Sequence, residues 1–338
     1  MEGKMLYSGK DLRKLIIPLI IEQILAIAVG MADTIMVSAA GEAAVSGVSL
    51  VDTVNILLIN VFSALATGGA VVSGHFLGKK KREDACKSAW QILLFATLLA
   101  LVISVIFITA HDPLLRLMFG KIEDDVMKAS KTYLIITTYS FVALAIYNSC
   151  AALFRAMNES KVTMWVSLLM NVINVVGNAI CIYGLHMGVT GVAIPTTISR
   201  YVAAVVIFLL MFQTKKEINL CGQITWKFNG SLIKKILYIA IPNGLENSMF
   251  QLGKILVMSA VATMGTSAIA ANAVTGTIAN WNNLPGFAIN LAIVSVVSVC
   301  VGAGRYDQAR YYTRRLCRDA MIGIGCLSII LYLSAPIL

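Results

Sequence analysis

Acidic side chains interrupt the most apolar parts of this sequence. Glu22 and Asp33 lie in the first apolar segment, Asp52 lies in the second, and Glu246 lies in a later one. A charge at the centre of a lipid bilayer costs about 2.5–3.5 kcal/mol on insertion scales, so each needs a partner or a cavity. Glu22 and Asp33 are separated by about 20° around a helix, which places both on one face. We therefore expect these acids to line a cavity that attracts cations.

A stripe of amides accompanies the acids. Asn171, Asn174 and Asn178 follow one another at helical spacing, so they share a helix face. Carboxylate, amide and hydroxyl oxygens suit Na⁺ or a protonatable relay. Hydrogen bonding between membrane helices would use the same amides equally well. With Asp33 as the acid, we favour a cation site, and we expect no other metal site because the cysteines are scattered without a paired spacing.

A second polar group surrounds an aromatic residue further along the chain. Asn272, Asn280 and Asn283 flank Trp281, a combination that predicts a wall for a large amphipathic substrate, with Glu22, Asp52 and Glu246 in the same cavity. Arg200 or Lys254 could instead neutralise one of the acids, and the sequence leaves this open.

Prolines remove a helical hydrogen bond and mark expected bending points. These are Pro18, Pro195, Pro242 and Pro285.

The composition requires a membrane. The 338 residues are 58% hydrophobic and 13% charged, with a mean hydropathy of +0.82, whereas soluble domains carry about 25% charged residues. Segments long enough to cross a bilayer recur throughout the chain. We therefore expect an all-α integral membrane protein with about nine spans. The expected spans are 15–38, 45–77, 88–110, 132–154, 162–184, 189–212, 236–263, 268–301 and 319–336.

The distribution of charge predicts how the chain lies in its membrane. The net charge is +10, and most of the basic residues fall on one side of the expected spans, which places the N-terminus in the cytoplasm. We read these clusters as topology signals and lipid contacts, and expect no nucleic-acid partner. The histidines are isolated, so the chain lacks the clusters that a membrane enzyme needs. We expect a monomer in the plasma (inner) membrane that needs no cofactor.

An internal repeat organises the chain. Residues 18–85 recur 224 positions downstream, inside equally apolar sequence. Six expected spans separate each element from its copy, and an even number gives parallel repeats related by an axis along the membrane normal. We expect a six-helix N-terminal lobe over 1–212, a cytoplasmic linker over 213–235, and three helices of a C-terminal lobe over 236–338. The pattern suggests a twelve-helix protein cut after its ninth helix; a natural nine-helix transporter is the alternative. The clearest matches are Pro18 with Pro242, Glu22 with Glu246, Gly41 with Gly265, and Gly78 with Gly302.

Three motifs together resemble the multidrug and toxic compound extrusion (MATE) family. The first is Pro18-x3-Glu22 followed by Asp33-Thr34-Ile35-Met36, which looks like the first helix of that family. The stretch 153–158 (Leu-Phe-Arg-Ala-Met-Asn) is similar to its turn after the fourth helix, and 301–309 is similar to its turn after the eighth. The similarity extends from about residue 11 to 338.

The resemblance implies a function and a site. Members of this family export cationic and amphipathic drugs in exchange for Na⁺ or H⁺, so a cation-coupled antiporter is expected. By resemblance, Asp33, Asn174, Asn178 and Thr196 form the cation site, and Asn178 stands where many members carry Asp. A lipid-linked oligosaccharide flippase of the same superfamily, or an inactive fragment, is the alternative.

Overall fold

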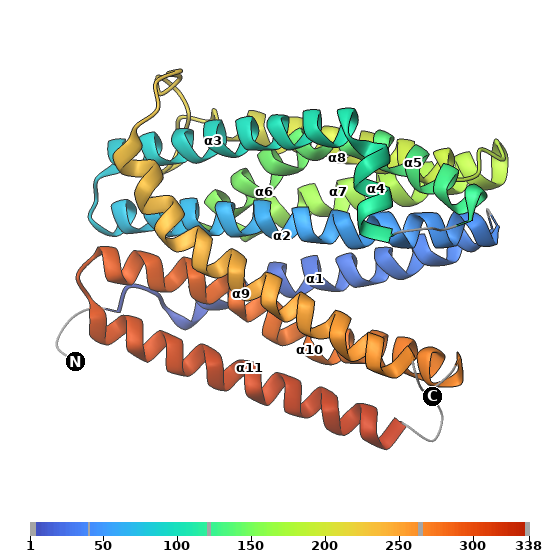
Figure 1. Cartoon of the computed structure of the whole chain (residues 1–338). Coiled ribbons are helices and arrows are strands. Elements are labelled where there is room, and N and C mark those ends of the chain that lie inside the picture. Colours follow the sequence, from blue (N-terminus) through green and yellow to red (C-terminus); the bar gives the residue numbers. More distant parts are fainter. Residues whose placement is uncertain (1–4, 40, 120–122, 263–265, 335–338) are drawn as a thin grey trace.

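The computed structural model describes residues 5–39, 41–119, 123–262 and 266–334, and in these ranges the regular structure is entirely helical (Figure 1). This confirms the all-α fold class. The elements are α1 (Gly9–Ser38), α2 (Glu42–Gly78), α3 (Arg82–Thr109), α4 (His111–Phe119), α5 (Asp124–Thr138), α6 (Phe141–Ala156), α7 (Ser160–Ala179), the π-helical turn η1 (Ile180–Gly184), α8 (Thr190–Leu210), α9 (Gly230–Ala262), α10 (Thr266–Gly302) and α11 (Tyr306–Ser334).

Most of these helices can cross a membrane. In the described ranges, seven are long and apolar enough, and α5 with α6 forms an eighth candidate bent by 50° where one span over 132–154 was expected. α9 occupies the place of the expected span over 236–263 but is not among the eight, because Asn243, Glu246 and Asn247 lower its hydropathy. The last residues of the expected ninth span, 335 and 336, lie outside the described residues. The chain is a multi-pass membrane protein.

Two helices begin earlier than the sequence predicts, because side chains cap their N-termini. α1 begins at Gly9, where the side chain of Ser8 accepts from the backbone N–H of Asp11 and the Asp11 carboxylate accepts from the N–H of Ser8. α9 begins at Gly230, inside the segment expected to be a linker. There the Asn229 side-chain oxygen accepts from the backbone N–H of Leu232 at 3.2 Å. The non-helical linker is therefore shorter than expected, covering residues 211–229.

Side chains of α3 hold this linker in place. The Arg82 guanidinium donates to the backbone carbonyls of Thr214, Lys216 and Glu217. Further along α3, the Trp90 indole N–H donates to the carbonyl of Thr225 at 2.7 Å. Because α3 satisfies these backbone carbonyls, the linker is part of the packed structure.

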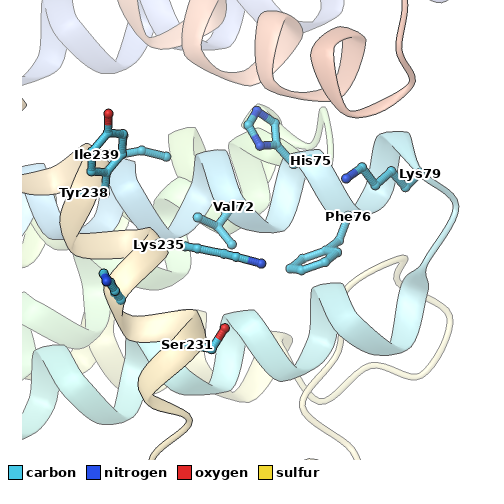
Figure 2. A pocket seen from close by; sticks show the side chains of 9 residues that line it. Val72, His75, Phe76, Lys79, Ser231, Lys235, Tyr238 and Ile239 are labelled. Atoms are coloured by element: carbon cyan, nitrogen blue, oxygen red, sulfur yellow. The ribbon is translucent and has the colours of Figure 1, made fainter.

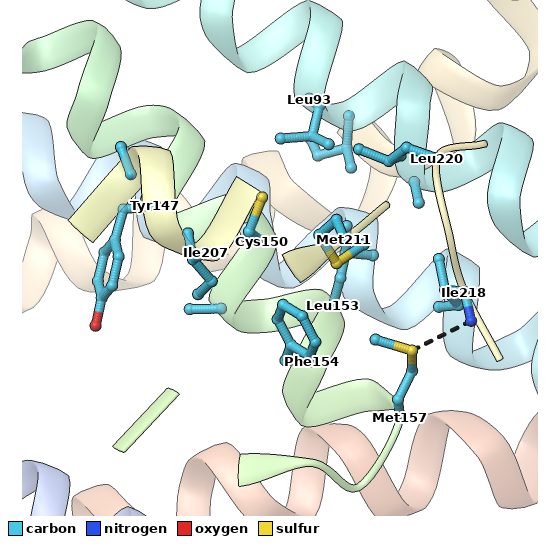
Figure 3. Close-up of a cluster of buried hydrophobic side chains, with 14 of the residues drawn as sticks. Leu93, Tyr147, Cys150, Leu153, Phe154, Met157, Ile207, Met211, Ile218 and Leu220 are labelled. Carbon is cyan, nitrogen blue, oxygen red and sulfur yellow. Dashed lines mark hydrogen bonds between the residues drawn. The ribbon is translucent and has the colours of Figure 1, made fainter. Parts of the chain in front are cut away.

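The linker also contributes to the largest apolar core. Ile218 and Leu220 are fully buried among residues of α3, α6 and α8 (Figure 3). Leu153 and Phe154 of α6 lie in the same cluster, and the backbone N–H of Ile218 donates to the Met157 sulfur at 3.2 Å. This core unites the linker with the helices that precede it.

The two copies of the repeat meet where α2 and α10 end. Both helices end at the same end of the molecule (Figure 1). A Cβ atom on Gly78 would lie 2.6 Å from the backbone nitrogen of Ala303, and one on Gly302 would lie 2.6 Å from the Cα of His75. Gly78 and Gly302 are equivalent in the repeat, so each copy presents the same glycine to the other, as in a twofold contact. Gly265, another expected match, lies outside the described residues.

Residues with left-handed backbone conformation follow three helices. Lys80 after α2 has a φ of 59° and Gly304 after α10 has a φ of 71°, at positions that the repeat also matches. Asn158 after α6 has a φ of 62°. Left-handed residues commonly end helices, so the two motif turns after α6 and α10 have a structural role in reversing the chain.

Substituting Gly302 with Ala is expected to lower stability by about 1–3 kcal/mol, because the added methyl group clashes with the backbone of α2 and forces the two helices apart. The matched control is Gly30→Ala in α1, where a Cβ meets nothing within 4 Å. Thermal unfolding of both purified variants in detergent checks this. An unfolding temperature for Gly302→Ala equal to that of the control would contradict the close contact.

Candidate functional site

Three polar side chains from two helices gather around Asp33 of α1. The Asn178 amide of α7 donates to Asp33 Oδ1 at 2.9 Å. The amide of Asn174 is oriented with its nitrogen 2.9 Å from the same oxygen and its own oxygen 2.9 Å from Thr196 Oγ1 of α8, an orientation that satisfies both groups. The structure thus brings together all four residues expected at the cation site.

Close packing of α7 and α8 positions this group. Asn174 and Asn178 are one helical turn apart on the buried face of α7. A Cβ on Gly177 would lie 2.6 Å from the Cβ of Pro195, so the absence of a side chain there lets α8 approach and bring Thr196 to the amides. The π-helical turn η1 follows directly after this segment, and such turns often occur at functional sites.

One buried oxygen atom of this group has no hydrogen-bond partner. Asn178 is fully buried, and its side-chain oxygen has no hydrogen-bond partner. Beside it lie the Asp33 carboxylate and the hydroxyl of Thr196. One carboxylate with neutral oxygens suits a monovalent hard cation or a proton. No group of three His, Cys, Asp or Glu residues that could hold a metal ion occurs in the part of the chain that the structure describes.

A second buried network lies beside the first. Asp52 of α2 accepts from the Tyr133 hydroxyl of α5 at 3.2 Å and from Asn55 at 3.3 Å. Arg200 of α8 donates to the Ser140 hydroxyl at 2.8 Å, and its charge acts on both Asp33 and Asp52. Among the described residues Arg200 makes no ion pair within 4.0 Å, so its guanidinium balances the acids from a distance.

Glu22 lies elsewhere, and the expectation that it lines a substrate cavity does not match its position. Its carboxylate is buried and pairs with Arg155 of α6 at 3.3 Å. It also accepts from the Thr163 hydroxyl of α7 at 2.9 Å. Like Asp33 it faces α7, as their spacing in α1 predicts. The sequence does not mark Arg155 as this partner, because the residue stands in the last turn of its helix, where a base is expected at the surface.

The residues expected to form one wall on α10 lie in different places. Asn272 and Asn280 line a cavity of about 720 Å³ between α9 and α10, together with Lys254 and Thr277. The indole N–H of Trp281 instead points to the sulfur of Met31 in α1, at 3.4 Å. Asn283 and Glu246 are exposed and line none of the cavities described.

The expected hinges lie inside continuous helices. Pro18, Pro195, Pro242 and Pro285 are within α1, α8, α9 and α10, respectively. The observed break falls instead between α5 and α6. There the hydroxyls of Thr137, Thr138 and Ser140 bond to preceding backbone carbonyls, and such bonds compete with the helix. The sequence signal for this break is the run from Thr137 to Ser140.

Comparison with known proteins identifies the family of this multi-pass helical protein. The sequence model of the MatE family matches residues 18–180 and 242–338. The chain therefore belongs to the MatE family. It is 28% identical over 297 residues to the uncharacterized transporter YisQ of Bacillus subtilis and 25% identical over 302 residues to a probable multidrug resistance protein NorM of Thermotoga maritima. These alignments cover 86% and 88% of the chain and 64% of each relative, so the chain spans slightly less than two thirds of their length.

Solved structures share the fold. An outward-facing conformation of a multidrug resistance MATE family transporter superposes with a TM-score of 0.89 at 21% identity, covering 97% of this chain and 72% of that one. A superfamily transporter from Pyrococcus furiosus, described as having a binding pocket of reverse polarity, gives 0.88 at 20% identity with the same coverage. The match at this identity establishes the fold.

Replacing Arg155 with Met is expected to destabilise the protein by about 3–5 kcal/mol, because it leaves the Glu22 carboxylate buried without its partner. Adding Glu22→Gln to that variant removes the uncompensated charge and is expected to recover most of the loss. Thermal unfolding of the single and double variants measures this. A double variant as unstable as Arg155→Met would contradict the pairing.

Proposed function

We propose that the chain functions as a cation-coupled antiporter, driven by Na⁺ or H⁺, that exports cationic or amphipathic small organic compounds by alternating access. Asp33 carries the proposal: it is a carboxylate within a membrane-spanning helix, held by two amides next to an unpaired amide oxygen. Membership of the MatE family supports it, as do the names of relatives such as the probable multidrug resistance protein NorM.

The chemistry of the cation step follows from these contacts. With the carboxylate ionised, the amide nitrogens of Asn174 and Asn178 stabilise its charge. A proton or Na⁺ that binds Asp33 neutralises the carboxylate charge, so the amide N–H groups stabilise it less. Rotation of an amide side chain would then present its oxygen to Na⁺. Either cation changes how α1 is held against α7. In our proposal this change shifts the equilibrium between states and favours release of the compound outward.

The orientation follows from charge. Lys79, Lys80 and Lys81 stand after α2, and Arg310 and Arg314 stand in the first turns of α11, at the same end of the molecule. We place this basic end in the cytoplasm of a cell with the protein in its plasma membrane. Each charge that crosses then contributes about 2.3 kcal/mol per 100 mV to transport.

We propose that the protein is a monomer of two lobes, residues 1–212 and 236–338, and that the compound binds in the second lobe. The cavity between α9 and α10 combines the amides of Asn272 and Asn280 with the aromatic ring of Phe250. Amides and an aromatic surface suit an amphipathic molecule of moderate size. The Lys254 ammonium lies 5.0 Å from the centre of the Phe250 ring, so both polar and apolar parts of a compound find partners there.

Asp33→Asn is expected to abolish ion-dependent efflux, because the neutral amide neither accepts a proton at physiological pH nor attracts Na⁺. Ethidium efflux from cells expressing the protein, with and without an imposed ion gradient, measures this. The control is Asp112→Asn, which removes an exposed acid paired with Lys131 and is expected to leave efflux unchanged. Ion-dependent efflux that persists in Asp33→Asn would reject Asp33 as the coupling residue.

Asn178→Asp is expected to tighten cation binding by about tenfold or more. Two unit charges 4 Å apart attract by about 4 kcal/mol at an effective dielectric of 20, and desolvation offsets only part of this. The ion concentration that half-saturates ethidium efflux reports the change. If Asn178→Asp requires the same or a higher concentration, the amide oxygen of Asn178 does not face the cation.

A further inference from the structure

A cationic cavity lies between the end of α2 and the start of α9. Its volume is about 570 Å³, and it lies at the basic end of the molecule, where α2 turns into α3 (Figure 2). His75 of α2 and Lys79, directly after its end, line one side of it, and Ser231, Lys234 and Lys235 of α9 line the other. The cavity therefore joins the first copy of the repeat to the helix that opens the second.

The cations of this cavity lack anionic partners. Within the described ranges, Lys79, Lys234 and Lys235 make no ion pair with an acidic side chain within 4.0 Å. Figure 2 shows the side chains of Lys79 and Lys235 directed toward the same space beside the ring of Phe76. Like charges that converge repel each other unless an anion lies between them. The cavity also adjoins the first turn of α9, whose helix dipole favours an anion.

The basic residues at the end of α2 are not repeated in the second copy. The positions 224 residues after His75 and Lys79 are Val299 and Ala303, which carry no charge. α2 therefore has a histidine and a lysine where its copy, α10, has small apolar residues. The basic residues that the end of α2 contributes to the cavity therefore have no basic counterparts at the end of α10.

An apolar stripe runs from the cavity along α9. Tyr238, which lines the cavity, is 82% exposed, and exposed apolar side chains follow it on the same helix face at helical spacing. The stripe leads away from the basic end, in the direction that lipid chains take from a headgroup into the bilayer. Its members after Tyr238 are Ile241, Leu245, Met249, Leu252 and Leu256.

We infer that this cavity binds the phosphate headgroup of an anionic phospholipid, with Lys79 and Lys235 on the phosphate and an acyl chain along the α9 stripe. Basic pockets between membrane helices at the cytoplasmic face suit such headgroups. The stripe favours a lipid over a soluble phosphate, because a soluble ion leaves those side chains without a role. The bound lipid bridges α2 and α9 and stabilises their contact at the basic end. This inference is independent of the transport proposal.

The test compares lipid binding by the full 338-residue chain and its variants, using native mass spectrometry and thermal unfolding. The probe is dioleoylphosphatidylglycerol, with dioleoylphosphatidylcholine, which is zwitterionic and has no net charge, as the comparison. Phosphatidylglycerol is expected to bind wild type and to raise its unfolding temperature more than phosphatidylcholine does. Lys79→Gln with Lys235→Gln is expected to weaken phosphatidylglycerol binding by about tenfold or more, since each lysine near an anionic lipid contributes about 1 kcal/mol.

Matched variants separate the cavity from general surface charge. Lys80→Gln with Lys81→Gln removes two neighbouring charges outside the cavity and is expected to retain binding, as is Lys79→Arg with Lys235→Arg. If the variant with glutamine at positions 79 and 235 binds phosphatidylglycerol as tightly as the variant with glutamine at positions 80 and 81, the inference is wrong. Displacement of phosphatidylglycerol by millimolar inorganic phosphate would also overturn it, because the site would then select a soluble anion.

Discussion

The close approach of α2 and α10 is the contact on which the arrangement of the two repeat copies depends. Gly78 and Gly302 allow backbone to meet backbone at the basic end, where any side chain would hold the helices apart. In lipid, burial of apolar surface gives membrane helices little reason to associate, so packing this close carries much of the association. Since the two glycines are equivalent in the repeat, one contact fixes the relation of both copies.

The same helix carries two acids with different environments. Glu22 and Asp33 both face α7, yet Glu22 meets a guanidinium and a hydroxyl whereas Asp33 meets two amides. A carboxylate paired with Arg155 has a permanent counter-ion and is suited to holding helices together. Asp33 is held by neutral amides, and the Arg200 guanidinium acts on it only from a distance, without an ion pair. This makes it the better candidate to exchange a cation. Glu22 and Asp33 therefore differ in the partners that α6 and α7 provide.

Part of the fold and part of the candidate site could be predicted from the sequence. The periodic amides of α7 could be assigned to one face with Asp33 as the acid, because helical spacing determines which side chains share a face. The repeat locates the glycine contact in the same way. Thr196 of α8 came only from the resemblance to the MATE family. The bend between α5 and α6 was missed because it arises from hydroxyl bonds to the backbone, without a proline or glycine. The partner of Glu22 was missed because pairing across helices depends on tertiary packing, which spacing along one chain does not encode.

The linker after α8 has a mechanical consequence. Arg82 and Trp90 bind its backbone, and Ile218 and Leu220 anchor it in a core built mainly from α3, α6 and α8, to which α9 also contributes. The linker therefore has little freedom to move, and it holds the first turn of α9 close to α3. Tilting of the later helices would then have to arise within α9, in which Pro242 removes one helical hydrogen bond. Because α3 and the core hold the linker, it has no free length to take up such a motion.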